Sequence, residues 1–404
     1  MIMAEAQAHK ILHFVPTIGR LSGGLAPVAL GLAYEQQRLG LQTQIWSLDT
    51  YAEIEWAKNI YQELAPNVNI FPVLGPRSIG YSPLLEKSML GPQGRFFDLL
   101  HQHSIWMASS RATNRWRQAF QRPTVITLHG TLEANVLRRS AWKKWLGGMV
   151  YEYRNLRAAS CLHALSENEA ASFRRFDLIN PIAIIPNGVS ETWVASRRDA
   201  RQFRERLQIS FDQRILLFLS RIHPKKGLPY LIEAASQLSD QLGGWQILIA
   251  GPDDNGHRRG MEILAAKRGI ENLIKFIGPV FGDEKANVFA SSDLFILPSQ
   301  SEGFPVAVLE ALGAGVPVIT TRGTPWGELR DERCGWWVDA SVNGIRDALR
   351  EAIYLPRTEL REMGVRGRNL VARKYTWPRI AERTTALYSW LLGTGKQPDF
   401  VVVD

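Results

Sequence analysis

The sequence predicts an α/β protein built from two doubly wound parallel-sheet domains, and three observations support this fold class. The chain has 404 residues, which suits two domains of ordinary size. Short apolar segments rich in β-branched residues alternate with longer amphipathic segments, a pattern typical of a parallel sheet covered by helices. The composition is 45% hydrophobic and 22% charged, so disordered, collagen-like and disulfide-scaffold classes are excluded.

The first half of the chain contains one series of predicted elements. Predicted strands lie at residues 10–15, 43–48, 68–74, 98–103, 124–128 and 161–164. Predicted helices lie between them at residues 24–39, 108–120 and 134–157. A further strand at residues 182–185 ends at the turn signal Pro186-Asn187-Gly188, which separates the two series.

A second series follows this turn. Its predicted strands lie at residues 215–219, 245–249, 273–277, 294–297 and 316–320, and its predicted helices at about 226–241, 257–269, 282–291 and 305–313. Helical segments near 356–374 and 377–392 have no further strand after them, and residues 393–404 are expected to form a loose tail. The predicted domains are therefore 1–190 and 191–375, with a C-terminal helix and tail at 376–404 that pack back towards the first domain.

Charge and cysteine usage limit the possible partners and compartments. The net charge is +9, and the bases between Arg111 and Lys144 face a single acid, Glu133. Such a cluster attracts nucleic acid, an anionic membrane surface or a phosphorylated substrate. The cysteines are Cys161 and Cys334, which fits a reducing compartment and offers no cysteine-based metal site. No apolar run approaches the ~20 residues of a spanning helix, and we expect a cytoplasmic protein.

Residues 298–310 form the segment with the strongest functional signal. A predicted strand ends at Leu297 and a helix is expected to begin at Pro305, which leaves free backbone N–H groups and a positive helix end for a phosphate. Gly303 allows a ligand to approach the backbone closely. Glu302 and Glu310 offer carboxylates that accept hydrogen bonds from hydroxyl groups. The alternative is that Glu302 caps the helix and Glu310 lies on a solvated face.

A basic loop at residues 220–227 follows the strand at 215–219. Arg221 can contact a diphosphate through two N–H groups, and Lys226 adds a second positive charge. The alternative is that this loop is a solvated turn with no ligand. No Asp-x-Asp motif lies near this loop or near residues 298–310, so we expect side chains rather than Mg²⁺ to neutralise a leaving group.

Weaker candidates lie in the first half of the chain. The loop that contains Gly23 and Gly24 follows the first strand but lacks the full G-x-G-x-x-G pattern of dinucleotide binders. His129 follows the strand at 124–128 and is expected to project into the cleft at the carboxyl ends of the strands, where ligands of such sheets bind. His101 and His103 lie on one face of a strand with no third ligand within reach in the sequence, so we interpret them as structural and predict no metal site.

In combination, these segments resemble the retaining glycosyltransferases of family 4. The resemblance spans about residues 10–392 and rests on the E-x7-E segment from Glu302 to Glu310, the Arg221/Lys226 loop, Pro186-Asn187-Gly188-Val189 and His129-Gly130. It implies the GT-B fold, in which two Rossmann-like domains face each other across a cleft. The N-terminal domain would bind the acceptor and the C-terminal domain the nucleotide-sugar.

The resemblance also implies roles for residues of the C-terminal domain. It assigns Glu302 to the 3- and 4-hydroxyls of the donor sugar, and Glu310 to the ribose hydroxyls. It assigns Arg221 and Lys226 to the diphosphate. Backbone groups near Phe304, Pro305 and Val306 assist there. The base-binding stretch, residues 276–280, borders the nucleotide base and ends at Val280.

In the N-terminal domain, the resemblance places Gly23 and Gly24 beside the donor phosphate and the acceptor. It places His129 near the 6-hydroxyl of the donor sugar. Family members often carry an acidic residue after the double glycine, whereas this chain has Leu25-Ala26-Pro27.

Residues 132–146 resemble bacterial exopolysaccharide glycosyltransferases in particular. This segment combines basic and aromatic side chains, which suits a membrane interface or an acceptor site. They are Arg138, Arg139, Trp142, Lys143, Lys144 and Trp145. The alternative is a solvated helix whose tryptophans face the core.

The resemblance implies a transferase of class EC 2.4 that needs no cofactor or metal ion. It would transfer a hexose, from UDP-glucose, to a glycan or lipid-linked acceptor in exopolysaccharide biosynthesis, with retention and at the inner face of the cytoplasmic membrane. A GDP-mannose-dependent mannosyltransferase is the alternative within the same fold. A nucleotide-dependent Rossmann-fold oxidoreductase, a nucleic-acid-binding protein and an inactive sugar-binding relative are the alternatives of other classes.

Overall fold

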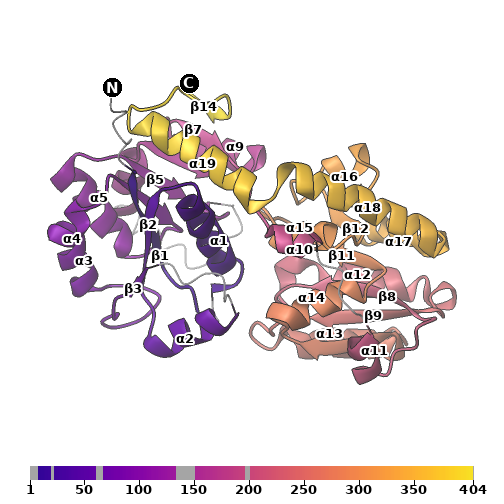
Figure 1. Cartoon of the computed structure of the whole chain (residues 1–404). Coiled ribbons are helices and arrows are strands. Elements are labelled where there is room, and N and C mark those ends of the chain that lie inside the picture. Colours follow the sequence, from indigo (N-terminus) through magenta and orange to yellow (C-terminus); the bar gives the residue numbers. More distant parts are fainter. Residues whose placement is uncertain (1–7, 20–21, 61–66, 133–150, 196–200, 404) are drawn as a thin grey trace. The chain divides into compact units, whose positions relative to one another are not determined.

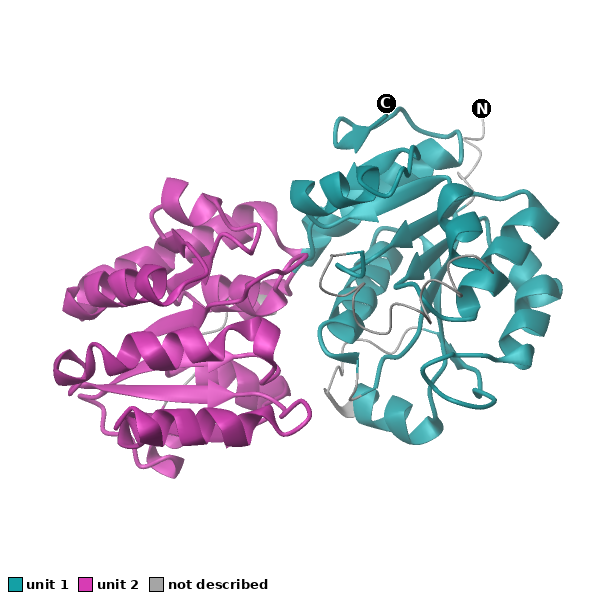
Figure 2. Cartoon of the chain, turned by 180° about the vertical axis from the view of Figure 1, so that it is seen from behind, with its two compact units in different colours: residues 1–188, 377–404 teal, residues 189–376 magenta. Residues whose placement is uncertain are grey.

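The computed structural model describes residues 8–19, 22–60, 67–132, 151–195 and 201–403. The chain forms two compact units, which Figure 2 shows in different colours. Unit 1 is Met1–Gly188 with Trp377–Asp404, and unit 2 is Val189–Thr376. Each unit is built on one mainly parallel sheet with helices around it (Figure 1). The predicted fold class of two parallel-sheet α/β domains is therefore confirmed.

The sheet of unit 1 is almost entirely parallel. Its strands in the described chain are β1 (Lys10–Val15), β2 (Gln42–Ser47), β3 (Val68–Ile70), β4 (Leu99–His103), β5 (Thr124–Thr127), β6 (Cys161–Ala164), β7 (Ile182–Ile184) and β14 (Val401–Val402). Their order is β14-β7-β6-β5-β4-β1-β2-β3, and β14 is antiparallel to β7. The central strands β4, β5 and β6 are buried along their whole length, as expected where helices cover both faces.

Helices of unit 1 connect these strands and cover the sheet. They are α1 (Leu25–Arg38), α2 (Tyr51–Ile60), α3 (Pro83–Leu90), α4 (Pro92–Arg95), α5 (Ser109–Phe120), α8 (Tyr153–Arg157), α9 (Glu167–Arg174) and α19 (Trp377–Leu391). Helix α19 returns from the C-terminal end of the chain and packs on α1. The contact is close, because a Cβ added at Gly31 would lie 2.4 Å from Nε1 of Trp377.

The sheet of unit 2 is fully parallel. Its strands are β8 (Arg214–Leu219), β9 (Trp245–Ala250), β10 (Ile274–Gly278), β11 (Leu294–Leu297), β12 (Val318–Thr321) and β13 (Gly335–Val338). They are arranged in the order β10-β9-β8-β11-β12-β13, which is the 3-2-1-4-5-6 order of dinucleotide-binding sheets. Apolar strands such as β9, in which every residue is buried, form the core of this unit.

Helices of unit 2 alternate with its strands. They are α10 (Glu191–Ala195), α11 (Arg201–Arg206), α12 (Leu228–Ser236), α13 (His257–Lys267), α14 (Gly282–Ala290), α15 (Val306–Gly313), α16 (Glu328–Asp331), α17 (Val342–Tyr354) and α18 (Arg357–Lys374). Helix α17 begins after Ser341, whose side chain accepts a hydrogen bond from the N–H of Gly344. Its apolar face packs on α12 and on β12 and β13.

The structure differs from the sequence prediction in several places. Helices α2, α3 and α9 were not among the predicted helices, and β3 ends at Ile70 rather than at residue 74. Residues 393–404 are not a loose tail, because Val401 is buried and β14 extends the sheet beside β7. Strand β13 and helix α17 were not predicted; β13 begins with a glycine and is only partly buried, so it lacks the apolar run of the central strands. Helix α15 begins at Val306 rather than at Pro305.

Each sheet reverses its strand order beside its first strand. The reversal lies between β1 and β4 in unit 1, and between β8 and β11 in unit 2. Ligands of open α/β sheets bind outside the carboxyl ends of the strands at this point. The loops at 220–227 and 298–305, which carry the predicted chemistry, follow β8 and β11. Among the described residues, no helix combines the length and the apolar character needed to cross a membrane.

Candidate active site

The loops that follow β8 and β11 in unit 2 touch each other through their backbones. Gly227 has a φ of +70°, and a Cβ at this position would lie 1.9 Å from the carbonyl oxygen of Pro298. The N–H of Gln300 donates to the carbonyl of Lys225 at 2.9 Å. Glycine is therefore required at 227, both for its backbone conformation and for the close approach of the two loops.

The loop that follows β12 supports the loop after β11. The N–H of Glu302 donates to the carbonyl of Gly323 at 2.8 Å, and the hydroxyl of Thr321 donates to the carbonyl of Ser299. A Cβ at Gly323 would lie 2.3 Å from the carbonyl oxygen of Gln300. These contacts fix the backbone on both sides of Glu302, and sequence reasoning did not predict them.

Glu302 and Lys226 form a largely buried ion pair. Nζ of Lys226 lies 2.5 Å from Oε1 of Glu302, and their side chains are 13% and 14% exposed. Burial alone would raise the pKa of Glu302, but the adjacent ammonium group outweighs it and holds this pKa below its usual value. The structure therefore brings together two residues that were predicted to act on one ligand, with the carboxylate charged at neutral pH.

The N-terminus of α15 is available to an anion. Pro305 occupies the N-cap position, and no side chain of the described chain caps this helix. The first N–H groups of a helix have no partner within the helix, and the helix dipole makes this end positive. Phe304 packs on Trp326, with ring centroids 5.0 Å apart, and this contact holds the entry to the helix. Phe304 and Val306 can offer backbone N–H groups here, whereas Pro305 has none.

One carboxylate oxygen of Glu310 is engaged in an ion pair, and the other has no hydrogen-bond partner among the described residues. Its Oε1 lies 2.5 Å from Nζ of Lys285 on α14, and its side chain is 10% exposed. Its Oε2 is buried and has no hydrogen-bond partner among the described residues. Sequence reasoning missed Lys285, because it comes from a different helix. The pair contradicts the alternative that Glu310 lies on a solvated face.

Arg221 lies apart from the Glu302–Lys226 pair. Its side chain is 60% exposed, and Nη1 lies 3.4 Å from Oδ2 of Asp254. The loop after β9 approaches closely, since a Cβ at Gly251 would lie 1.9 Å from the carbonyl oxygen of Ser220. An exposed arginine in a long ion pair can reorient towards a diphosphate at small cost. Val280, in the predicted base-binding stretch, is buried.

In unit 1, the predicted glycine loop follows β1. Gly23 has a φ of +58° with open space around it, and Gly24 is the N-cap of α1. No side chain of the described chain caps this helix, so its first N–H groups face the loop. The double glycine thus lies at the carboxyl edge of the sheet in unit 1, at the end of its first strand.

His129 is held in an uncommon backbone conformation directly after β5. Its φ is +53°, and that of Gly130 is +73°. The N–H of Gly130 donates to Oε1 of Glu169 at 2.6 Å, and the N–H of Leu165 donates to its Oε2 at 2.8 Å. This buried carboxylate, which sequence reasoning missed, fixes the turn that presents the imidazole.

The structure adds a third imidazole to His101 and His103, contrary to the expectation that none was within reach. His13 of β1 pairs with His101 across the sheet, and all three are buried. Both nitrogens of His101 already have partners, the hydroxyls of Tyr388 at 2.5 Å and Thr127 at 2.6 Å. Its ring also stacks on that of His103 with centroids 4.3 Å apart. One ring nitrogen of each histidine lies within 4.8 Å of those of the other two, close enough to hold a metal ion, but both nitrogens of His101 are already engaged in hydrogen bonds.

Two family models match most of the chain. Residues 23–188 match the model described as a glycosyl transferase 4-like domain, and residues 199–369 match the model described as glycosyl transferases group 1. The first match lies within unit 1 and the second within unit 2. The chain belongs to the family 4-like glycosyltransferases of the GT-B fold. The family resemblance seen in the sequence is thus confirmed.

Several relatives of this glycosyltransferase match over almost their full length. The chain is 28% identical over 393 residues to a GDP-mannose:cellobiosyl-diphosphopolyprenol alpha-mannosyltransferase of Komagataeibacter xylinus, covering 95% of this chain and 94% of the relative. It is 25% identical over 411 residues to a D-inositol 3-phosphate glycosyltransferase of Actinosynnema mirum, covering 91% and 92%.

Solved structures confirm the GT-B fold. The crystal structure of Anabaena Alr3699/HepE with UDP and glucose matches this glycosyltransferase with a TM-score of 0.76 at 18% identity, covering 95% of this chain and 100% of that chain. A sucrose-phosphate synthase of Thermosynechococcus elongatus matches with a TM-score of 0.75 at 21% identity, covering 96% and 100%.

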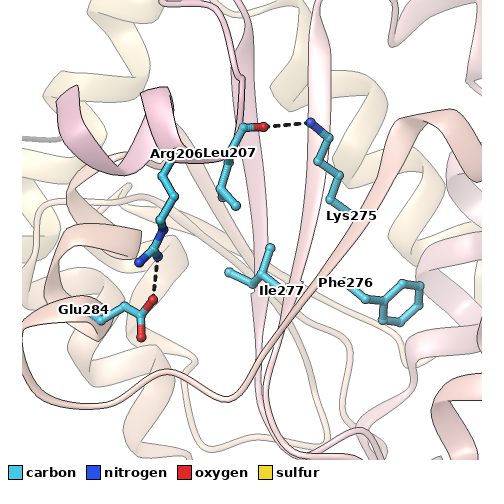
Figure 3. A pocket seen from close by; sticks show the side chains of 6 residues that line it. All are labelled: Arg206, Leu207, Lys275, Phe276, Ile277 and Glu284. Carbon is cyan, nitrogen blue, oxygen red and sulfur yellow. Dashed lines mark hydrogen bonds and ion pairs between the residues drawn. The ribbon is translucent and has the colours of Figure 1, made fainter.

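In this glycosyltransferase, a cavity of about 490 Å³ lies beside the predicted base-binding stretch of unit 2 (Figure 3). Phe276 and Ile277 of β10 line it together with the Arg206–Glu284 ion pair, whose atoms are 2.5 Å apart. The predicted membrane or acceptor residues, Arg138, Arg139, Trp142, Lys143, Lys144 and Trp145, lie outside the described residues.

Proposed function

We propose that the chain transfers a hexose, with retention, from a nucleoside-diphosphate sugar to a glycan or lipid-linked acceptor. The observation that carries this proposal is the arrangement at the carboxyl edge of unit 2. There, Glu302 of the largely buried Glu302–Lys226 pair shortly precedes the N-terminus of α15, which no described side chain caps, and the pair and the helix start share one loop system. A carboxylate for hydroxyl groups and positive groups for phosphate are the two requirements of such a donor.

Each part of the donor matches a different group of residues at this site. Lys226, Arg221 and the N–H groups at the start of α15 suit the diphosphate. The unpartnered Oε2 of Glu310 suits the ribose hydroxyls, because a buried carboxylate oxygen without a hydrogen-bond donor is unfavourable until a ligand supplies one. Glu302 suits the hydroxyls of the transferred sugar.

The proposed reaction is a substitution on one face of the anomeric carbon. The bond from that carbon to the diphosphate oxygen breaks, and a bond to the acceptor oxygen forms on the same face. The acceptor proton passes to the departing phosphate. Lys226, Arg221 and the helix dipole stabilise the charge on the leaving group, and no metal ion is required.

The sequence favours UDP-glucose as the donor and exopolysaccharide synthesis as the role. The Komagataeibacter relative, which is named for GDP-mannose and a diphosphopolyprenol acceptor, supports GDP-mannose as the alternative donor. Its name also supports a lipid-linked acceptor. In this proposal the basic and aromatic residues within 132–146 contact anionic lipid at the membrane surface, where such an acceptor lies.

Transfer itself tests the proposal. The full chain is incubated with UDP-glucose or GDP-mannose and a polyprenyl-diphosphate-linked disaccharide, and NMR gives the anomeric configuration of the product. We expect an α-linked product from an α-linked donor, and at least about 100-fold slower transfer by Glu302→Gln.

Glu233→Gln is the matched control, because Glu233 pairs with Arg268 at 2.7 Å in the same unit but away from this loop system. It should leave transfer unchanged. Equal rates for Glu302→Gln and the wild type, or an inverted product, would contradict the proposal.

A further inference from the structure

A chain of buried side chains leads from His129 into the core of unit 1. Nε2 of His129 lies 3.4 Å from Nδ1 of His103, and Nε2 of His103 lies 3.1 Å from Nδ1 of His13. Nε2 of His13 lies 2.8 Å from Oε1 of Gln36 on α1. We call these four side chains the imidazole chain. His13 comes from β1, His103 from β4 and Gln36 from α1, and His129 lies in the turn after β5.

The rings of the imidazole chain meet edge to edge, as hydrogen bonding requires. The ring centroids of His103 and His129 are 5.6 Å apart, and those of His13 and His103 are 5.4 Å apart. These separations are far larger than the 4.3 Å of the stacked pair His101–His103. The nitrogens that face each other within the imidazole chain can therefore share protons along the line that joins them.

All the imidazoles of this chain are neutral. Burial is the main cause that lowers the pKa of His13 to about 4 and that of His129 to about 3, and it also lowers the pKa of His103 well below its ordinary value. A neutral imidazole carries one proton, so one of its nitrogens donates and the other accepts. The direction of the first hydrogen bond consequently sets the direction of all the others.

A second chain of hydrogen bonds runs beside the imidazole chain. It starts at the carbonyl of Ile185, which only accepts, so His163 donates from Nε2 at 2.7 Å and must accept at Nδ1. The hydroxyl of Thr127 lies 2.8 Å from that Nδ1 and donates to it. Thr127 then accepts from Nε2 of His101, which leaves Nδ1 of His101 as an acceptor.

The second chain ends at Tyr388. Its hydroxyl lies 2.5 Å from Nδ1 of His101 and donates its single proton there. Gln36 is not joined to this chain by a hydrogen bond, because its Nε2 is buried without a partner among the described residues. The direction of the imidazole chain is instead set by Oε1 of Gln36, which faces His13 and can only accept. His13 donates to that oxygen, His103 donates to His13, and His129 donates to His103.

We propose that the imidazole chain fixes His129 in the tautomer with its proton on Nε2, so that Nδ1 is left to accept a hydrogen bond from a substrate hydroxyl. The described residues provide no hydrogen bond to Nδ1, and the residue is only partly buried. Gln36, His13 and His103 are positioning residues that act through His129. The role of the substrate hydroxyl rests on the proposed glycosyl transfer, whereas the tautomer does not.

The tautomer is measured on the full chain with ¹⁵N-labelled histidine, because nitrogen chemical shifts distinguish protonated from unprotonated ring nitrogens. We expect His129 to carry its proton on Nε2 without any substrate. A proton on Nδ1 in the wild type overturns the inference. This measurement needs no variant and no activity, so its failure is separate from a failure of the proposed function.

A variant pair tests the cause. Gln36→Met removes the acceptor that orients the imidazole chain, and we expect a mixture of His129 tautomers together with a 3- to 10-fold lower kcat/KM, the size of one neutral hydrogen bond. Thr127→Val is the matched control, since it breaks only the second chain, two residues from His129. It should leave both the His129 tautomer and kcat/KM unchanged. An unchanged His129 tautomer in Gln36→Met overturns the inference.

Discussion

Glu310 provides the sharpest prediction about the donor site. Its Oε1 is held by Lys285 at 2.5 Å, and its buried Oε2 has no partner among the described residues. If the ribose diol of a nucleoside diphosphate donates to Oε2, the bond is charge-assisted and contributes about 1.5–3 kcal/mol. Glu310→Gln should therefore weaken nucleotide binding by about 10- to 150-fold, since each 1.4 kcal/mol is a factor of ten.

Titration calorimetry with the full chain measures this affinity, and a ligand without the diol tests its cause. The wild type should bind a 2′,3′-dideoxynucleoside diphosphate about 10- to 150-fold more weakly than the normal one. Glu310→Gln should distinguish the two ligands much less. Lys285→Met is the control, because it keeps the carboxylate and should keep the discrimination. The reasoning is refuted if Glu310→Gln discriminates against the dideoxy ligand as strongly as the wild type does.

Three further predictions concern stability and metal dependence. Gly227→Ala should destabilise unit 2 by about 3 kcal/mol more than Gly256→Ala. The φ angles are +70° at Gly227 and +76° at Gly256, but of the two only a Cβ added at Gly227 would lie 1.9 Å from a carbonyl oxygen. Equal melting points of the two variants would contradict this prediction. In urea titrations, stability should fall between pH 7.5 and 5.5. His13 and His163, with pKa values lowered to about 4, stay neutral in the folded state while the unfolded chain takes up protons. Over this range, each such histidine lowers the free energy of unfolding by about 1.3 kcal/mol. Glu152, whose pKa is raised to about 7, takes up a proton in the folded state and offsets part of this loss, but less than the histidines together remove. Constant or rising stability would show the sign to be wrong. Transfer should continue in excess EDTA, and a loss restored by Mg²⁺ would contradict neutralisation by side chains.

Much of the fold could be predicted from the sequence, because parallel strands buried on both faces are long apolar runs. Strands β1, β6 and β11 were predicted with their observed bounds. Strand β13 was missed because it is only partly buried and begins with a glycine, and β14 because its pairing with β7 depends on a distant part of the chain.

The local parts of the site were also predictable, whereas its long-range contacts were not. Loops that follow strands of a parallel sheet lie at one edge, so Lys226 and Glu302 could be expected near each other before their distance was known. Lys285, His13 and Glu169 reach their partners from other elements. Their contacts depend on strand register and helix rotation, as when β1 and β4 bring His13 opposite His101.

The most direct test of the central claim, that unit 2 binds a nucleoside-diphosphate sugar, is a thermal-shift panel on the full chain. It contains UDP, GDP, UDP-glucose, UDP-galactose, UDP-GlcNAc, GDP-mannose and NADH. A ligand at 100 times its Kd adds about 2.7 kcal/mol of stability, which raises the melting point measurably. We predict stabilisation by one nucleoside diphosphate and its matching sugar donor, lost in Glu310→Ala. Stabilisation by NADH alone, or by none of the nucleoside diphosphates and their sugars, would contradict the account.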